Sequence, residues 1–145
     1  MMKKIFLILI ALATFVACET SEDISFGLDH EVPSYRVLTD SLQVKKGQTV
    51  TIKVEVSDNA GLSKVVFSYG DWVIREAIML DEKPKSYTFE TSILIPDDAA
   101  TEWQEGIILN NGSKQTITQH YHKLLLEATD INMNVRNIPI YIKVE

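Results

Sequence analysis

The stretch TVTIKVEVS, residues 49–57, decides the fold class because its apolar and polar residues alternate. Side chains of a β-strand point alternately to opposite faces, so this pattern predicts a strand with one apolar and one polar face. The apolar face carries Val50, Ile52, Val54 and Val56. Turn-forming residues flank the strand, KGQ before it and DNAG after it. We therefore expect an antiparallel strand that is buried on one side only.

Stretches of the same kind run along the rest of the chain. We expect strands over residues 24–27, 35–38, 62–69, 72–80, 86–95, 121–129 and 138–144, a hairpin of 106–109 with 114–118, and an irregular stretch from 96 with room for one helical turn. Pro139 predicts an edge or a locally unpaired site in the last strand. Short strands with frequent turns predict an all-β fold, an immunoglobulin-like antiparallel β-sandwich of about seven to eight strands.

The composition fits a single domain and excludes several classes of protein. The chain has 145 residues, of which 46% are hydrophobic and 23% charged, the profile of one globular domain rather than of a disordered chain. Its 14 basic and 20 acidic residues give a net charge of −6, which argues against nucleic acid as a partner because phosphates attract basic surfaces. The single cysteine excludes a disulfide scaffold and a cysteine-based zinc site.

The N-terminus has the pattern of an export signal that ends at this cysteine. Lys3 and Lys4 precede an apolar run over residues 5–16, which is too short to span a bilayer as a helix but has the length of a signal-peptide core. The sequence FVAC, residues 15–18, resembles the lipobox of bacterial lipoproteins, in which lipid is attached to the cysteine thiol. This resemblance implies a signal peptide over residues 1–17 and acyl chains such as palmitate at Cys18. The alternative is ordinary cleavage that leaves Cys18 as a free thiol.

Resemblances beyond the cysteine extend this interpretation. The acidic stretch ETSED, residues 19–23, predicts a flexible tether and resembles the export tag of Bacteroidetes surface lipoproteins, which implies the outer face of the outer membrane. The stretches at 56–65 and 121–130 resemble strand corners of bacterial immunoglobulin-like domains. Together they imply a small Bacteroidetes-type surface lipoprotein with one such domain over residues 24–145. For such proteins the resemblance implies no particular chemistry.

Two tryptophans are the candidates for contact with a ligand. Trp103 lies in the polar stretch TEWQE without strand periodicity, so we expect it to be exposed. Trp72, between Asp71 and Val73, is expected in the core or at its rim. Aromatic faces stack on the apolar faces of sugar rings, so either residue could contact a glycan. The alternative is that each tryptophan covers one end of the core.

Histidines are the candidates for a metal site. His120 and His122 are two residues apart on an expected strand, which would place both imidazoles on one face. Zinc needs three or four ligands, and the sequence fixes no third one, although His30 or a carboxylate could supply it. The alternative, which we favour, is a pair of half-exposed strand residues that bind no metal.

An acidic turn raises the question of calcium. Residues 130–134, DINMN, carry oxygen side chains at alternate positions, as the start of an EF-hand loop does. Val135 and Tyr141 stand where that loop needs a glycine and an acid, so we expect an Asx-rich turn instead. Asp58 and Asn59 could join a calcium site there only if the two turns lie at the same end of the sandwich.

The sequence carries no motif of a known catalytic mechanism. It has no nucleophile elbow, phosphate-binding glycine loop or HExxH pair, so we expect no enzymatic activity and no cofactor. The tripeptide at 40–42 resembles a Bacteroidetes O-glycosylation site at Ser41, with a solvated turn as the alternative. We expect a binding or accessory module, held at the membrane by its lipid anchor, that contacts a glycan or an envelope protein. The alternatives are a structural spacer or a subunit of an envelope assembly without a soluble ligand, and a metal-binding protein.

Overall fold

The computed structural model describes residues 29–39 and 42–145, and these residues form strands, turns and loops. The strands are β1 (Ser34–Val37), β2 (Gln43–Val44), β3 (Thr49–Ser57), β4 (Leu62–Tyr69), β5 (Ile74–Met79), β6 (Ser86–Leu94), β7 (Trp103–Ile108), β8 (Lys114–Gln119), β9 (His122–Asp130) and β10 (Val135–Val144). Within this part of the chain there is no helix long and apolar enough to cross a membrane. Cys18, the expected tether over 19–23, the expected strand over 24–27 and Ser41 lie outside the described residues.

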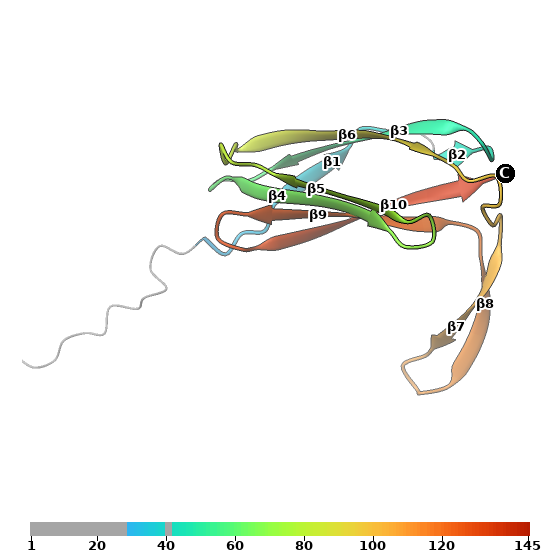
Figure 1. Ribbon diagram of the computed structural model, residues 1–145. Coiled ribbons are helices and arrows are strands. Elements are labelled where there is room, and N and C mark those ends of the chain that lie inside the picture. Colours follow the sequence, from blue (N-terminus) through green and yellow to red (C-terminus); the bar gives the residue numbers. More distant parts are fainter. Residues whose placement is uncertain (1–28, 40–41) are drawn as a thin grey trace, which may run out of the picture.

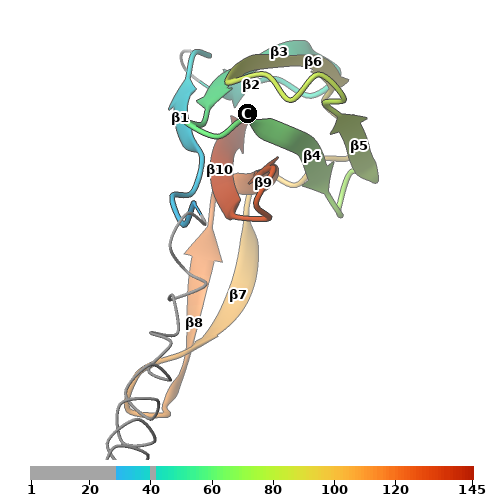
Figure 2. The ribbon, with the colours of Figure 1, turned by 90° about the vertical axis from the view of Figure 1, so that its left-hand side faces the viewer.

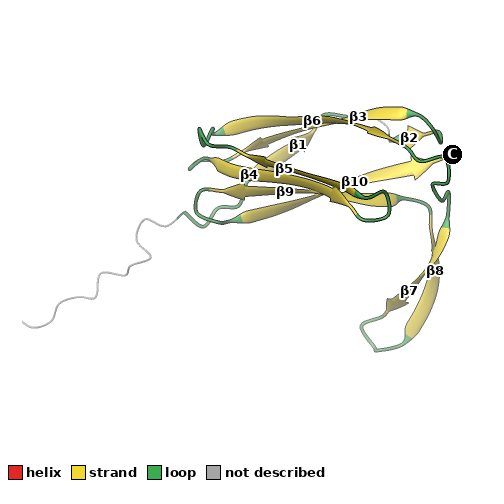
Figure 3. Ribbon diagram, viewed as in Figure 1, coloured by secondary structure: helices red, strands yellow, loops and turns green. Residues whose placement is uncertain are grey.

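Two sheets face each other and form a β-sandwich (Figure 1). The first sheet has the strand order β1-β3-β6, and the second has the order β2-β10-β9-β4-β5. Neighbouring strands are antiparallel except β2 and β10, which pair in parallel through two residues. Strands that alternate between two sheets in this order are typical of the immunoglobulin-like fold. Figure 3, coloured by secondary structure, shows strands and loops only. The expected fold class is confirmed.

The core forms from the faces that the alternation in the sequence marks. Ile52, Val54 and Val56 of β3 are fully buried, and so are Ile138 and Ile142 of β10. The intervening residues point outward, where Lys53 of β3 pairs with Glu90 of the neighbouring β6. Apolar faces on both sheets are thus removed from water, which is the main favourable contribution to folding.

One aromatic contact joins the two sheets at the centre of the sandwich. Phe67 of β4 and Phe89 of β6 are both fully buried, and their ring centroids are 5.4 Å apart with a tilt of 45°. Aromatic pairs at this separation and tilt contribute beyond the area that they bury. The contact therefore holds β4 and β6 face to face.

Several of the expected strand boundaries were wrong, and β2 was not expected. β1 begins at Ser34 rather than at 35, and β10 begins at Val135 rather than at 138. β5 begins at Ile74 rather than at 72, because Gly70–Val73 forms a turn in which Val73 has a φ of 53°. β9 begins at His122, after a break at residues 120–121 that separates it from β8. The stretch from 96 makes turns but no helical turn. Pro139 pairs with β9 on one side of β10. On the other side β2 pairs only with residues 143–144, so within the described residues Pro139 has no strand partner there, and the expected unpaired site is confirmed.

The hairpin β7–β8 leaves the sandwich. Its strands pair from Trp103 opposite Gln119 to Ile108 opposite Lys114, so the expected hairpin is confirmed and longer than expected. Gly112 at its tip has a φ of 80°, a conformation that glycine adopts readily. Figures 1 and 2 show the hairpin extending away from the end of the sandwich at which the chain finishes. Few of its residues are apolar, and Ile108 is 72% exposed, so the hairpin adds no layer to the core.

Truncation of the central aromatic pair tests this account of the core. Phe89→Ala should lower the free energy of unfolding by about 3–5 kcal/mol, because it removes a buried aromatic ring and leaves a cavity. Leu94→Ala, on the same strand but 64% exposed, is the matched control and should change the stability by less than about 1 kcal/mol. Urea unfolding followed by tryptophan fluorescence measures both. Equal losses would contradict the sandwich core described above.

Candidate functional site

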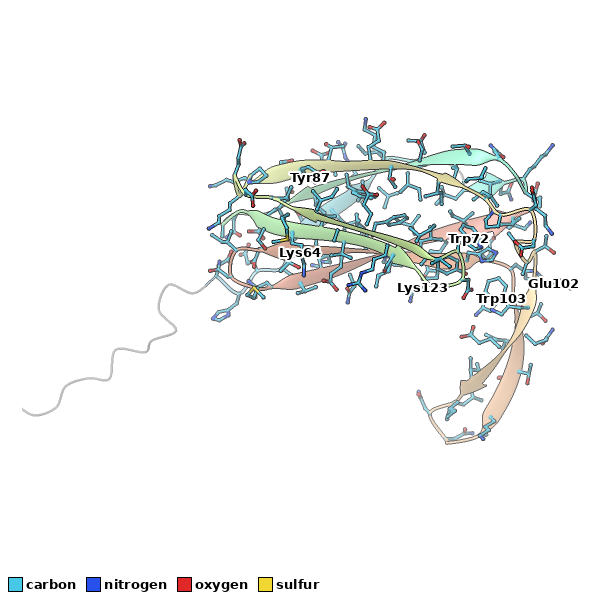
Figure 4. All side chains as sticks on the ribbon, in the orientation of Figure 1. Lys64, Trp72, Tyr87, Glu102, Trp103 and Lys123 are labelled. Carbon is cyan, nitrogen blue, oxygen red and sulfur yellow. The ribbon has the colours of Figure 1, made fainter. Side chains whose placement is uncertain are left out.

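An aromatic cluster lies at the end of the sandwich from which the hairpin projects. Tyr69 ends β4, Trp72 lies in the turn before β5, Trp103 begins β7 and His122 begins β9. Figure 4 shows Trp72 and Trp103 together at this end, with Lys123 nearby. Segments far apart in the sequence meet here because β4 and β9 are neighbours in the five-stranded sheet.

His122 is the centre of the cluster. Its side chain is 2% exposed, and its ring centroid lies 4.6 Å from that of Trp72 and 4.9 Å from that of Trp103. Tyr69 meets it edge to face, with centroids 5.7 Å apart and an interplanar angle of 84°. Tyr69 also packs edge to face on Trp72 at 5.0 Å. Such tilted and edge-on arrangements are the favourable ones for aromatic rings.

A chain of hydrogen bonds fixes the orientation of the histidine ring. Its Nε2 lies 2.7 Å from the carbonyl oxygen of Ala100, which only accepts, so Nε2 carries a hydrogen. Its Nδ1 lies 2.7 Å from the Tyr69 hydroxyl, and that hydroxyl lies 2.7 Å from Oδ2 of Asp71. The hydroxyl has a single hydrogen, so all three contacts are satisfied together only when an additional proton resides on the ring or on the carboxyl group.

The hydroxyl of Tyr69 is a donor rather than a base. Burial, followed by the hydrogen bond to Asp71 and the negative charge of that carboxylate, raises the pKa of Tyr69 well above its ordinary value. The tyrosinate therefore does not form near neutral pH, and the hydroxyl retains its hydrogen. This chain of contacts can hold aromatic rings in place, but it does not supply an activated nucleophile.

A cleft opens between the aromatic cluster and the hairpin. Its volume is about 480 Å³, and its walls combine aromatic, charged and amide side chains: Tyr69, Asp71, Trp103, Glu105, Gln119, Tyr121, Lys123 and Tyr141. Tyr121 and Tyr141 are about half exposed, and Trp103 forms the wall next to His122. A concave site with aromatic surfaces and a few polar groups is the usual form of a small-ligand site.

The polar groups of the cleft are oriented by contacts across the hairpin. Gln119 donates a hydrogen bond of 2.7 Å from its Nε2 to Oε2 of Glu105, so the two side chains hold each other in place. The Asp71 carboxylate accepts a hydrogen bond from the Tyr69 hydroxyl. Lys123 brings a positive charge to a cleft that also carries the carboxylates of Asp71 and Glu105. The cleft thus offers both donors and acceptors beside its aromatic surfaces.

The two tryptophans singled out in the sequence are brought together. Trp103 is half-buried at the start of a strand, so the expectation of an exposed residue outside a strand was wrong. It faces the cleft, whereas Trp72 packs behind it against His122 and the core. Trp72 therefore lies at the rim of the core, which was one of the two positions expected for it.

The two histidines lie in different surroundings. The expected shared face was wrong, because the chain turns at residues 120–121 and the alternation of a strand does not apply across that break. His120 is exposed, and its Nδ1 lies 3.8 Å from Oε2 of Glu102. His122 is buried with both ring nitrogens in hydrogen bonds, so it presents no free nitrogen to a metal ion.

Trp103 is the one residue of the cleft wall that was a candidate in the sequence. The other seven were not recognised: Tyr69, Asp71, Glu105, Gln119, Tyr121, Lys123 and Tyr141. Tyr141 lies at an outward-facing position of β10, and Tyr121 lies directly before β9. An aromatic residue at such an exposed position could have been recognised in the sequence as a candidate for ligand contact. Tyr69 continues the half-buried run of β4, so nothing local distinguishes it from a core residue.

Comparison with models of known protein families gives no match. No curated protein matches the sequence either.

Removal of a single hydroxyl tests the hydrogen-bond chain. Tyr69→Phe should lower the free energy of unfolding by about 1–3 kcal/mol, because it leaves Nδ1 of the buried His122 without its partner. Tyr35→Phe, which removes the hydroxyl of a tyrosine that is 46% exposed, is the matched control and should be nearly neutral. Chemical denaturation of both variants gives the comparison. A neutral Tyr69→Phe would contradict a structural role for the contact.

Proposed function

We propose that this protein binds a carbohydrate in the cleft between the β7–β8 hairpin and the sandwich, without transforming it. The observation that carries the proposal is the cleft itself, with a volume of about 480 Å³ and Trp103, Tyr121 and Tyr141 along its walls. Aromatic faces carry partial negative charge and attract the C–H groups of a sugar ring. The hydroxyl groups of the same sugar also need hydrogen-bond partners beside those aromatic surfaces.

The polar residues of the cleft meet that second requirement. Asp71 and Glu105 are acceptors, Lys123 is a donor, and the Gln119 amide is both. A site that pairs apolar ring faces with such groups suits a sugar better than a purely apolar ligand.

We further propose that the chain is anchored by lipid at Cys18 to the outer face of the outer membrane. The FVAC stretch at 15–18 and the acidic residues that follow it support this location. Asp29, the first residue described, contacts the β9–β10 turn through Asn134, at the end opposite to the hairpin. The described part of the chain thus begins at the end of the sandwich opposite to the cleft.

Contact with a partner protein of the envelope is the second candidate function. The exposed apolar side chains at the hairpin tip favour it, because Ile108 is 72% and Leu109 39% exposed. Apolar side chains on a projecting element are common in protein–protein contacts. In this reading the hairpin is the contact element, and the protein acts as an accessory subunit.

Substitution in the cleft tests carbohydrate binding. Full-length protein purified in detergent should bind a subset of oligosaccharides on a glycan array, and titration calorimetry with the best of them should give a measurable Kd. Trp103→Ala should weaken that binding at least about tenfold, and Tyr141→Ala several-fold, because each removes an aromatic surface. Tyr35→Ala, an equally exposed tyrosine on β1, is the control and should bind like the wild type. Equal binding by all variants would contradict the proposal.

Replacement of the cysteine tests the anchor. Wild-type protein from the native host should carry the mass of attached acyl chains and fractionate with the outer membrane, whereas Cys18→Ser should lose both properties. Acyl chains contribute about 0.8 kcal/mol for each buried CH₂, so several chains make attachment effectively permanent. Intact-protein mass spectrometry and membrane fractionation measure the two effects. An unmodified thiol in the wild type would contradict the proposal.

A further inference from the structure

Three aspartates meet at the end of the sandwich opposite to the aromatic cleft. Asp29 precedes β1, Asp58 lies in the β3–β4 turn and Asp130 ends β9. One carboxylate oxygen of each lies within 4.8 Å of those of the other two. The two turns are neighbours because Leu62 at the start of β4 pairs with Asp130, and Ile131 N–H donates to the Gly61 carbonyl. The β3–β4 and β9–β10 turns thus lie at the same end of the sandwich, as a shared ion requires.

The carboxylates are held rigidly by the backbone of their own turns. Oδ1 of Asp58 accepts from the N–H groups of Ala60 and Gly61, at 2.9 and 3.0 Å. Oδ1 of Asp130 accepts from the N–H groups of Asn132 and Asn134, at 2.8 and 2.7 Å, which confirms the expected Asx-rich turn. The Asn134 amide donates both to Oδ2 of Asp130 and to the Asp29 carbonyl oxygen. Oδ1 of Asp29 accepts from the N–H group of Glu31 at 2.9 Å. Hydrogen bonds thus orient all three carboxyl groups but do not neutralise them.

The cluster lacks a positive charge. Asp58 is 8% exposed and Asp130 is fully buried, yet within residues 29–39 and 42–145 neither they nor Asp29 forms an ion pair with lysine, arginine or histidine. Oδ2 of Asp29 is buried and has no hydrogen-bond partner among the residues that the structure describes. A buried carboxylate oxygen without a partner is costly, and neighbouring like charges increase that cost. A cation at this place would give that oxygen a partner and offset the repulsion among the carboxylates.

Three carboxylates are the kind of ligand that a hard divalent cation takes. Calcium binds oxygen ligands at about 2.3–2.6 Å, so ligands on opposite sides of one ion are at most about 5 Å apart. The three carboxylate oxygens all lie within 4.8 Å of one another, which fits that limit. Calcium accepts several carboxylates in a flexible geometry, whereas magnesium demands a near-ideal octahedron and keeps most of its water, so carboxylates from three separate segments suit calcium better. A hollow of about 330 Å³, lined by Glu31, Asp58 and Asn59 among others, adjoins the cluster and leaves room for water as a further ligand.

We propose that Asp29, Asp58 and Asp130 bind a calcium ion that ties the N-terminal end of the domain to the β3–β4 and β9–β10 turns. The ion removes the repulsion among the three carboxylates and supplies the partner that Oδ2 of Asp29 lacks. It thereby fixes the segment that enters β1 onto the five-stranded sheet. This site is separate from the cleft, so it stands or falls independently of carbohydrate binding.

Thermal unfolding with and without calcium tests the site. Full-length protein stripped with a chelator should gain about 5–10 °C in Tm at 10 mM CaCl₂, as expected for a Kd of about 0.1–1 mM. Asp29→Asn should abolish this gain, while its Tm without calcium should equal or exceed that of the wild type because one repelling charge is gone. Asp81→Asn, an exposed aspartate in another turn, is the control and should keep the full gain.

Calorimetric titration completes the test. Wild-type protein should bind one calcium ion, and Asp29→Asn should bind at least about tenfold more weakly. Three results would overturn the proposal: no gain in Tm for the wild type, the same gain in Asp29→Asn, or an equal gain with MgCl₂. The last of these would remove the assignment to calcium specifically.

Discussion

The contact between Phe67 and Phe89 joins the two sheets, and both ends of the molecule depend on it. Each sheet contributes one apolar face, and the faces can meet only if every strand keeps its register. A shift by one residue would turn the apolar residues of β3 or β10 outward. With the register fixed, the loops at the two ends have fixed neighbours. The aromatic cleft and the carboxylate cluster are consequences of that arrangement.

The hairpin between β6 and β9 shows how a surface element can create a site without disturbing the core. Its strands contribute little to the buried interior, but the chain enters and leaves it beside the start of β9. Trp103 is thereby placed beside His122, and Glu105 and Gln119 line the cleft. The histidine, clamped by Ala100 and Tyr69, gives the cleft a rigid base. Loops on a rigid scaffold commonly carry function for this reason.

The two ends of the sandwich offer different chemistry. One end carries aromatic rings with a few polar groups, and the other carries three carboxylates on rigid turns. The N-terminal end of the described chain joins the acidic end, so the cleft lies at the far side from it. The calcium ion and the carbohydrate that we propose would thus bind at opposite ends of the sandwich.

The sequence by itself determined the all-β class, the buried faces of β3, β6 and β10, the hairpin and the Asx-rich turn at Asp130, because each follows from residues close together in the chain. It also pointed to Trp72 and Trp103, but not to their shared contact with His122. Only the tertiary structure decided that contact, the separation of His120 from His122, and the meeting of Asp29, Asp58 and Asp130. The alternation of apolar and polar residues predicts which side of a strand is buried. Which loops meet depends instead on the order of the strands in the sheets, and that order results from packing between distant parts of the chain.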